Sequence, residues 1–196
     1  MFCFIANIMD KISQFRGFGN SKKGKIVTIT DQIKEEDVAS DVRTALESVM
    51  DPEIRALSVI DLGIIPQIDV KDGAFITVYL TPTFSGCPAI HIMQKMIRDR
   101  VLESFPNYAV EVKVDFERQW NSNLISDKGR EALKNFELAP PPRYSGEFDP
   151  ETLKNIACPR CGSQNTTLQS PFGPTLCRSV HFCFDCKENF QQFKPL

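Results

Sequence analysis

Four cysteines near the C-terminus are arranged as two CxxC pairs, CPRC from Cys158 and CFDC from Cys183. Each CxxC pair forms a tight knuckle that points two thiolates at one ion, and two knuckles supply the four sulfurs of a tetrahedral zinc site. The module is short and rich in phenylalanine, with too little apolar bulk to fold alone, so metal binding would contribute its folding free energy. The spacing predicts structural zinc on Cys158, Cys161, Cys183 and Cys186.

Competing versions of this metal site stay open. Cys177 lies between the two pairs and could replace one ligand, and His181 lies two residues before Cys183. Four cysteines can also hold an iron–sulfur cluster. A closed four-thiolate zinc site has no open coordination position, so its role would be structural. Because the module mixes acidic and basic residues, docking to a protein is favoured over binding to a nucleic acid.

A fifth cysteine lies in the loop TPTFSGCPAI, residues 81–90. If Pro88 takes the first position of a helix, Cys87 is the N-cap residue, and the helix dipole would favour its thiolate and lower its pKa. Thr81 and Thr83 add hydroxyl donors. The loop could therefore bind an anion, or stabilise a thiolate that binds a metal. The alternative is that Cys87 packs as a small apolar residue.

Two further groups could join a site around Cys87. His91 lies one helical turn after Cys87, so a thiol enzyme would use Cys87 as the nucleophile and His91 as its base, but no third group marks this pair. Asp51 and Glu53, in DPEI, could act as paired carboxylates. Considered without the rest of the chain, Asp51 and Glu53 are better explained as part of a turn that ends a helix.

Periodic apolar residues predict the elements that carry these loops. Residues 35–49 place Val38, Val42, Leu46 and Val49 at helical spacing, and Val110, Val112 and Val114 alternate in a strand. The predicted order is helix 35–49, strand–turn–strand 57–80, helix 88–101, strand 108–116 and a short helix after Ser126 as its N-cap. These stripes predict an α+β fold: a small sheet with helices on one face, followed by a small zinc-ribbon module.

The sequence divides into four parts. We predict a leader over 1–34, the α+β domain over 35–138, a proline-rich linker over 139–154 and the zinc ribbon over 155–196. The leader lacks a positive segment before its apolar run, which stops at Asp10, so it does not resemble a signal peptide, and translation could start at Met1 or Met9.

Net charge and cysteine content limit the classes of function that fit this chain. The net charge is −2 and the pI about 5.8, which gives no electrostatic case for nucleic-acid or membrane binding. Seven cysteines, an odd number, without a secretion signal indicate metal or thiol chemistry rather than disulfides. We therefore expect a cytoplasmic protein.

Taken together, four stretches resemble the PaaD (also PaaJ) family from about residue 36 to the C-terminus: DPEI–RALSVIDLGII, VYLTPTFSGCPAI, Trp120 followed by SDKGREAL and LAPP, and CPRCGS–FGPTLCRSVHFCFDC–ENFQQFK. The first half is also similar to the domain of SufT and of eukaryotic cytosolic iron–sulfur targeting factors. The resemblance implies a compact domain in which the DPE turn lies close to the Cys87 loop. Its motif residues here are Asp51, Glu53, Thr81, Thr83, Cys87 and Pro88.

The resemblance implies a maturation factor for the phenylacetyl-CoA epoxidase of aerobic phenylacetate breakdown. Implied partners are its diiron oxygenase subunit or its [2Fe–2S] reductase, together with the iron–sulfur assembly machinery. The implied cargo is iron or a transient iron–sulfur cluster on Cys87. One thiolate holds a cluster weakly, which suits transfer, and a second ligand would come from a partner or from the second subunit of a homodimer. The alternative is an adaptor subunit that docks through its zinc ribbon and transfers no metal.

Two positions depart from the family pattern. Arg55 stands where a proline often follows the DPE turn, and Leu124 replaces the second aromatic residue after Trp120. Neither change touches Cys87 or the CxxC pairs, so they concern contacts with partners.

Overall fold

Three strands with alternating apolar residues build the first sheet. In the computed structural model, which describes residues 29–143, 150–154 and 156–195, β1 (Gln67–Lys71) and β2 (Phe75–Leu80) form an antiparallel hairpin, and β3 (Ala109–Val114) lies parallel to β2. The side chains of β2 and β3 that face the core, as period-two alternation requires, are Ile76, Val78, Leu80, Val110, Val112 and Val114.

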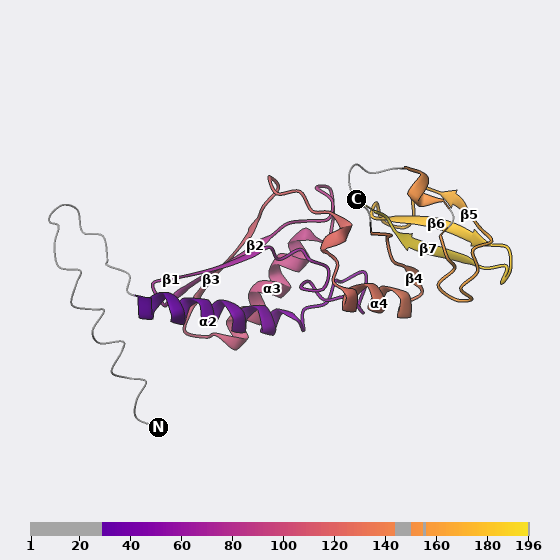
Figure 1. Cartoon of the computed structure of the whole chain (residues 1–196). Coiled ribbons are helices and arrows are strands. Elements are labelled where there is room, and N and C mark those ends of the chain that lie inside the picture. The colour runs from indigo at the N-terminus through magenta and orange to yellow at the C-terminus, as the bar shows by residue number, and fades with distance from the viewer. Residues whose placement is uncertain (1–28, 144–149, 155, 196) are drawn as a thin grey trace, which may run out of the picture.

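Two helices cover one face of this sheet (Figure 1). In α2 (Ile29–Leu46), Val42 and Leu46 are buried, and α3 (Ile90–Ser104) connects β2 to β3 and buries one side. The parallel pairing of β2 and β3 requires such a crossover. The predicted sheet with helices on one face is therefore confirmed.

The apolar stretch 57–66 is not a strand, although the sequence predicted one. It forms successive turns, in which the N–H of Leu62 donates to the carbonyl of Ser58 at 2.8 Å, and Gly63 has a φ of 74°. A side chain at Gly63 would also collide with the backbone of Leu124. The stretch is apolar because it runs through the core, and burial alone does not distinguish a buried turn from a strand.

Helix boundaries also differ from prediction. Helix α2 begins at Ile29 and ends at Leu46, so Val49 is buried beyond the helix, just after a turn. A short 3-10 turn, η2 (Ser122–Leu124), precedes α4 (Asp127–Asn135). The Ser126 N-cap is confirmed, because its Oγ accepts the N–H of Gly129 at 2.9 Å.

The C-terminal part of the chain forms a second sheet (Figure 1). Its strand order is β4-β7-β6-β5, with antiparallel pairing except between β4 and β7, which are parallel. The remaining elements are β4 (Leu138–Ala139), η3 (Pro150–Leu153), β5 (Thr166–Ser170), β6 (Arg178–Cys183) and β7 (Asn189–Phe193). Strand β4 includes Ala139, where the predicted linker begins, and residues 144–149 of that linker lie outside the described residues.

The second sheet contributes side chains to the core of the first domain. Phe193 of β7 is buried against Trp120, with ring centroids 5.9 Å apart, and the indole N–H of Trp120 donates to the carbonyl of Leu62 at 3.0 Å. The guanidinium of Arg178 donates to the carbonyl of Glu53 at 3.0 Å. Contacts of this kind hold the second sheet against the DPE turn.

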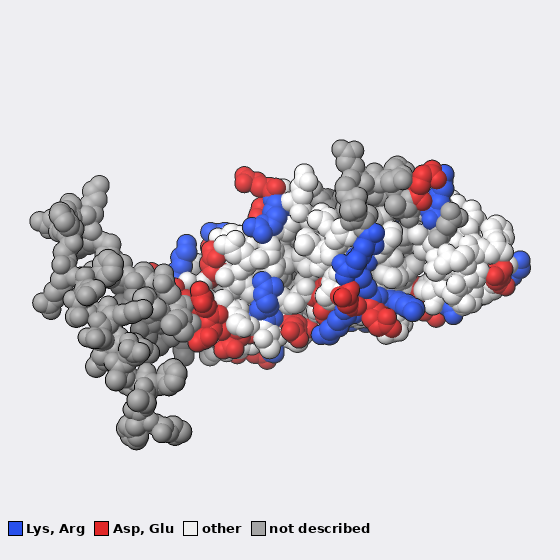
Figure 2. Space-filling view, in the orientation of Figure 1, with Lys and Arg blue, Asp and Glu red and all other residues white. Residues whose placement is uncertain are grey.

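The described surface has mixed charge. Acidic and basic side chains are interspersed on the face shown in Figure 2. Among the helices that the structure describes, none combines the length and apolar character needed to cross a membrane. Most of the predicted leader, residues 1–28, lies outside the described residues.

Candidate functional site

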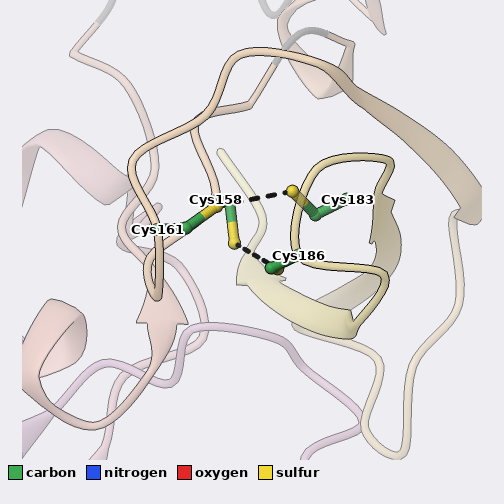
Figure 3. A group of neighbouring side chains, drawn as sticks. All are labelled: Cys158, Cys161, Cys183 and Cys186. Carbon is green, nitrogen blue, oxygen red and sulfur yellow. Dashed lines mark hydrogen bonds between the residues drawn. The ribbon is translucent and has the colours of Figure 1, made fainter.

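The four cysteines of the CxxC pairs converge in the second sheet (Figure 3). One pair lies in the loop before β5, and the other begins at the end of β6. Their sulfur atoms all lie within 4.8 Å of one another, and the four residues are Cys158, Cys161, Cys183 and Cys186. Two loops far apart in sequence thus present four thiols to one point.

The sulfur positions fit a tetrahedral metal ion. The Sγ atoms of Cys158 and Cys186 are 3.8 Å apart, and those of Cys161 and Cys183 are 3.6 Å apart. A zinc ion with bonds of about 2.3 Å to sulfur needs sulfur–sulfur edges of about 3.8 Å. The backbone N–H groups of Cys186 and Asp185 lower the pKa of Cys183 to about 7, whereas burial and the neighbouring thiols raise the pKa of Cys186 to about 12. Without a metal the cluster therefore favours a thiolate at Cys183, and a bound metal ion would displace the protons of the other thiols.

The two other candidate ligands of this module lie elsewhere. His181 is buried, stacked on Phe190 at 5.2 Å between ring centroids, and its Nε2 is 3.0 Å from the Ser179 hydroxyl. Burial lowers the pKa of His181, so the ring packs as a neutral aromatic group. Cys177 belongs to a different cavity. Among the described residues, the cluster consists of the four CxxC cysteines.

The loop around Cys87 is built differently from the prediction. Helix α3 begins at Ile90 with Ala89 as its N-cap residue, so Cys87 is not the N-cap. Residues 88 and 89 form a turn instead, and the N–H of Cys87 donates to the carbonyl of Phe84 at 3.0 Å. Cys87 is a free, half-buried thiol packed against the main core.

The pKa of Cys87 is raised, contrary to the expected depression. Burial is the largest cause, and it outweighs the N–H of Ala89, which favours the thiolate. Nearby Cys177, Glu53 and Asp51 also disfavour a negative charge on Cys87. The thiol is therefore protonated unless something positive binds beside it.

A cavity of about 310 Å³ opens beside Cys87 and is lined by both halves of the molecule. The first domain contributes Glu53, Thr83 and Cys87, and the loop before β6 contributes Leu176 and Cys177. The carbonyl of Cys177 accepts the N–H of Lys194, and its sulfur lies 3.2 Å from the Thr175 hydroxyl. Cys177 was singled out from the sequence only as a replacement for a zinc ligand, because no local pattern links it to Cys87.

The two carboxylates of the DPE turn have different roles. One carboxylate oxygen of Asp51 accepts the N–H groups of Glu53 and Ile54, both at 2.8 Å, so Asp51 closes the turn as its turn chemistry predicts. The carboxylate of Glu53 has no hydrogen bond or salt bridge within the described part of the chain, and Glu53 lines the cavity.

The remaining predicted residues lie in three different environments. Thr81 is buried at the end of β2, and its hydroxyl has no hydrogen-bond partner among the described residues. Thr83 lines the cavity. His91 is exposed on α3, with its Nδ1 3.3 Å from the side-chain oxygen of Gln94, and it does not line the Cys87 cavity. The arrangement therefore places no histidine base in the Cys87 cavity.

Comparisons with known proteins match both halves of the chain. The family model described as PaaD zinc beta ribbon domain matches residues 145–194, and the model described as iron–sulfur cluster assembly protein matches residues 39–114. An Escherichia coli protein described as one of the subunits of 1,2-phenylacetyl-CoA epoxidase is 32% identical over 151 residues, which cover 76% of this chain and 88% of that protein.

The first domain has relatives of its own. A Porphyromonas gingivalis protein described as an Fe-S protein maturation auxiliary factor is 35% identical over 94 residues, which cover 48% of this chain and 85% of the relative. A crystal structure of the domain of unknown function DUF59 from Bacillus anthracis has a TM-score of 0.50 at 21% identity, covering 52% of this chain and 96% of that chain. This likeness shows the fold of the first domain.

Proposed function

Since this chain belongs to the PaaD family, we propose that it is an accessory factor that assists assembly of an iron–sulfur or iron centre of a phenylacetyl-CoA epoxidase. The observation that carries the proposal is the position of Cys87. Within the domain that matches the iron–sulfur assembly model, a free thiol and the free carboxylate of Glu53 line one cavity. The relatives of this domain include a protein named for Fe-S protein maturation.

The chemistry of the cavity suits temporary binding of iron. Thiolate and carboxylate oxygen both bind iron, whereas the surrounding loop supplies no complete cage. A donor must release its cargo, so a small ligand set in an open cavity favours transfer to an acceptor. The proposal places the chain in the cytoplasm, where thiols are kept reduced.

The four-cysteine cluster has a separate, structural role in this proposal. Zinc held by Cys158, Cys161, Cys183 and Cys186 would close its coordination sphere and fold the ribbon. The fit of the sulfur–sulfur distances to a zinc tetrahedron supports this assignment. The ribbon then holds its loop 173–177 against the Cys87 cavity.

The test is complementation in cells that make the epoxidase but lack this protein. Wild type and His91→Ala should restore phenylacetate-dependent growth and the iron content of the purified epoxidase. Cys87→Ser should leave both at the level of cells without the protein. If Cys87→Ser restores the iron content fully, the proposal is wrong.

An adaptor role is the second candidate, favoured by apolar side chains exposed on the ribbon. Phe172, Leu176 and Phe184 are all exposed. Such residues are common at protein interfaces. An adaptor would copurify with the active epoxidase at fixed stoichiometry, and Cys87→Ser would leave the complex and its metal content intact.

A further inference from the structure

The cavity beside Cys87 contains a second thiol from the other half of the molecule. Cys177 lies in the ribbon, ninety residues later in the chain, yet both cysteines line the same space of about 310 Å³. Both are free and packed against the same core. Cys177 is separate from the zinc cluster, so that cluster does not account for it.

The contacts around Cys177 fix its position relative to Cys87. Arg178, the next residue, donates to the carbonyl of Glu53 at 3.0 Å and to the side-chain oxygen of Gln191 at 3.2 Å. The carbonyl of Cys177 accepts the N–H of Lys194 at 2.9 Å. The loop of Cys177 is therefore attached both to the DPE turn and to the end of β7.

The charges of the cavity favour a cation. Glu53 and Asp51 disfavour a negative charge on either thiol, and Cys177 does the same to Cys87. Burial raises the pKa of Cys177, as it does that of Cys87, while the Thr175 hydroxyl and the nearby Arg178 oppose the rise. A metal ion would remove this mutual repulsion, because its positive charge would offset the charges of two thiolates that lie near the Glu53 carboxylate.

We propose that Cys87 and Cys177 together bind the iron that this protein carries, beside the negative charge of Glu53, so that the cargo site lies between the assembly domain and the zinc ribbon. This inference rests on the proposed function and adds its ligand set. Each thiol loses one proton to solvent and forms one sulfur–iron bond, and no electron is transferred. The second thiolate comes from the same chain, so a second subunit is not required.

The test is metal titration of the full, zinc-loaded chain purified without oxygen, with Co²⁺ as an optical probe. Wild type should bind one Co²⁺ beyond the ribbon zinc, with a sulfur-to-cobalt absorption band. Cys87→Ser and Cys177→Ser should each lose about half of the band and about tenfold or more in affinity, since even residues that only support a metal ligand have effects of this size. The double variant should lose the band entirely.

Controls separate ligand loss from misfolding. Zinc content and Trp120 fluorescence report on the ribbon and its contact with the first domain, and Cys177→Ala provides a second replacement that cannot bind metal. Glu53→Gln should keep the band but weaken binding, whereas His91→Ala should bind as wild type does. Titration with Fe²⁺ alone and with Fe²⁺ plus sulfide then distinguishes a bound ion from a bound cluster.

The outcomes separate the two proposals. If Cys177→Ser binds Co²⁺ like wild type while Cys87→Ser does not, the two-thiol site is wrong and the role of Cys87 stands. If neither variant differs from wild type, or wild type binds no additional Co²⁺, the two-thiol site is also wrong, and complementation by Cys87→Ser decides the proposed function independently. A Cys87–Cys177 disulfide in a protein whose reduced form takes up no metal would replace the site with a redox pair.

Discussion

At the scale of single residues, two carboxylates of the same motif have different roles. Asp51 and Glu53 are two positions apart, yet Asp51 is buried and accepts two backbone N–H groups, whereas Glu53 faces a cavity. A buried acceptor that satisfies two N–H groups stabilises the fold, because its loss would leave those donors without partners. Only the second carboxylate is available to a ligand.

Asp51→Ala should therefore destabilise the protein, by about 1–2 kcal/mol, as expected for the loss of a side-chain cap. Asp51→Asn, which keeps the acceptor oxygen, should lose less. Urea unfolding of the two variants measures the difference. Loss of Co²⁺ binding in a stable Asp51→Asn variant would contradict the assignment of Asp51 to the turn and of Glu53 to the cargo.

The reactivity of Cys87 should depend on pH in a way that its burial dictates. Because its pKa is raised, the thiolate fraction, and with it the alkylation rate, should reach half-maximum at a higher pH than in an unfolded peptide of residues 81–90. In Glu53→Gln the midpoint should move down, since a negative charge that disfavours the thiolate is gone. Mass spectrometry after timed iodoacetamide labelling gives the rates, and a midpoint below that of the peptide would contradict this environment.

At the scale of elements, α4 is held by its first residues. The Ser126 hydroxyl caps the Gly129 N–H and donates to the carboxylate of Asp61 at 2.6 Å. Burial raises the pKa of Asp61, but hydrogen bonds from Ser126 and Ser58, together with Lys128, more than offset this and hold the pKa below its ordinary 3.8. The cap thus connects α4 to the buried turns of residues 57–66.

Ser126→Ala should cost about 1 kcal/mol at neutral pH. A lowered carboxyl pKa contributes stability above the ordinary value of 3.8, and that contribution disappears as the pH falls through the lowered value. The difference between wild type and Ser126→Ala should therefore shrink in strongly acidic buffer. Urea unfolding at both pH values measures it, with Ser104→Ala at the exposed end of α3 as the control. An undiminished difference in acid would show that Asp61 is not involved.

At the scale of the whole molecule, the ribbon adds Phe193 to the core of the first domain and has a smaller core of its own around Phe190. The chain has a single tryptophan, Trp120, and it packs on Phe193 of the ribbon while its indole N–H bonds to Leu62. The fluorescence of the chain therefore reports on the junction between the two sheets. The four-cysteine cluster lies in the ribbon, beyond that junction.

Removing zinc with a chelator should unfold the ribbon and shift the Trp120 emission to longer wavelength, because the indole ring loses its contact with Phe193 and becomes more exposed to solvent. Alkylation of Cys87 should accelerate as the loop of Cys177 leaves. Cys158→Ser should behave like the chelated wild type, and re-addition of zinc should reverse the change only in wild type. Unchanged emission after complete zinc loss would mean that the ribbon folds without its metal.

Local sequence patterns were enough to predict the metal-binding cysteines, the start of one helix and one strand of the sheet. The CxxC spacing identified four cysteines that do converge, Ser126 marked the start of α4, and the alternation of Val110, Val112 and Val114 marked β3. Each of these signals lies within a few residues, over which helix, strand and knuckle geometry directly constrain residue type. The role of Cys87 as a functional thiol came from family resemblance and stays a prediction.

Contacts between segments that are far apart in the sequence became known only from the tertiary structure. It placed Cys177 beside Cys87, left Glu53 free while Asp51 closed the turn, and showed that residues 57–66 turn through the core. It also paired β4 with β7, which joins the predicted linker to the ribbon sheet. Contacts between residues ninety positions apart depend on how whole elements pack, and packing of buried apolar surface is non-directional, so no short stretch of sequence records it.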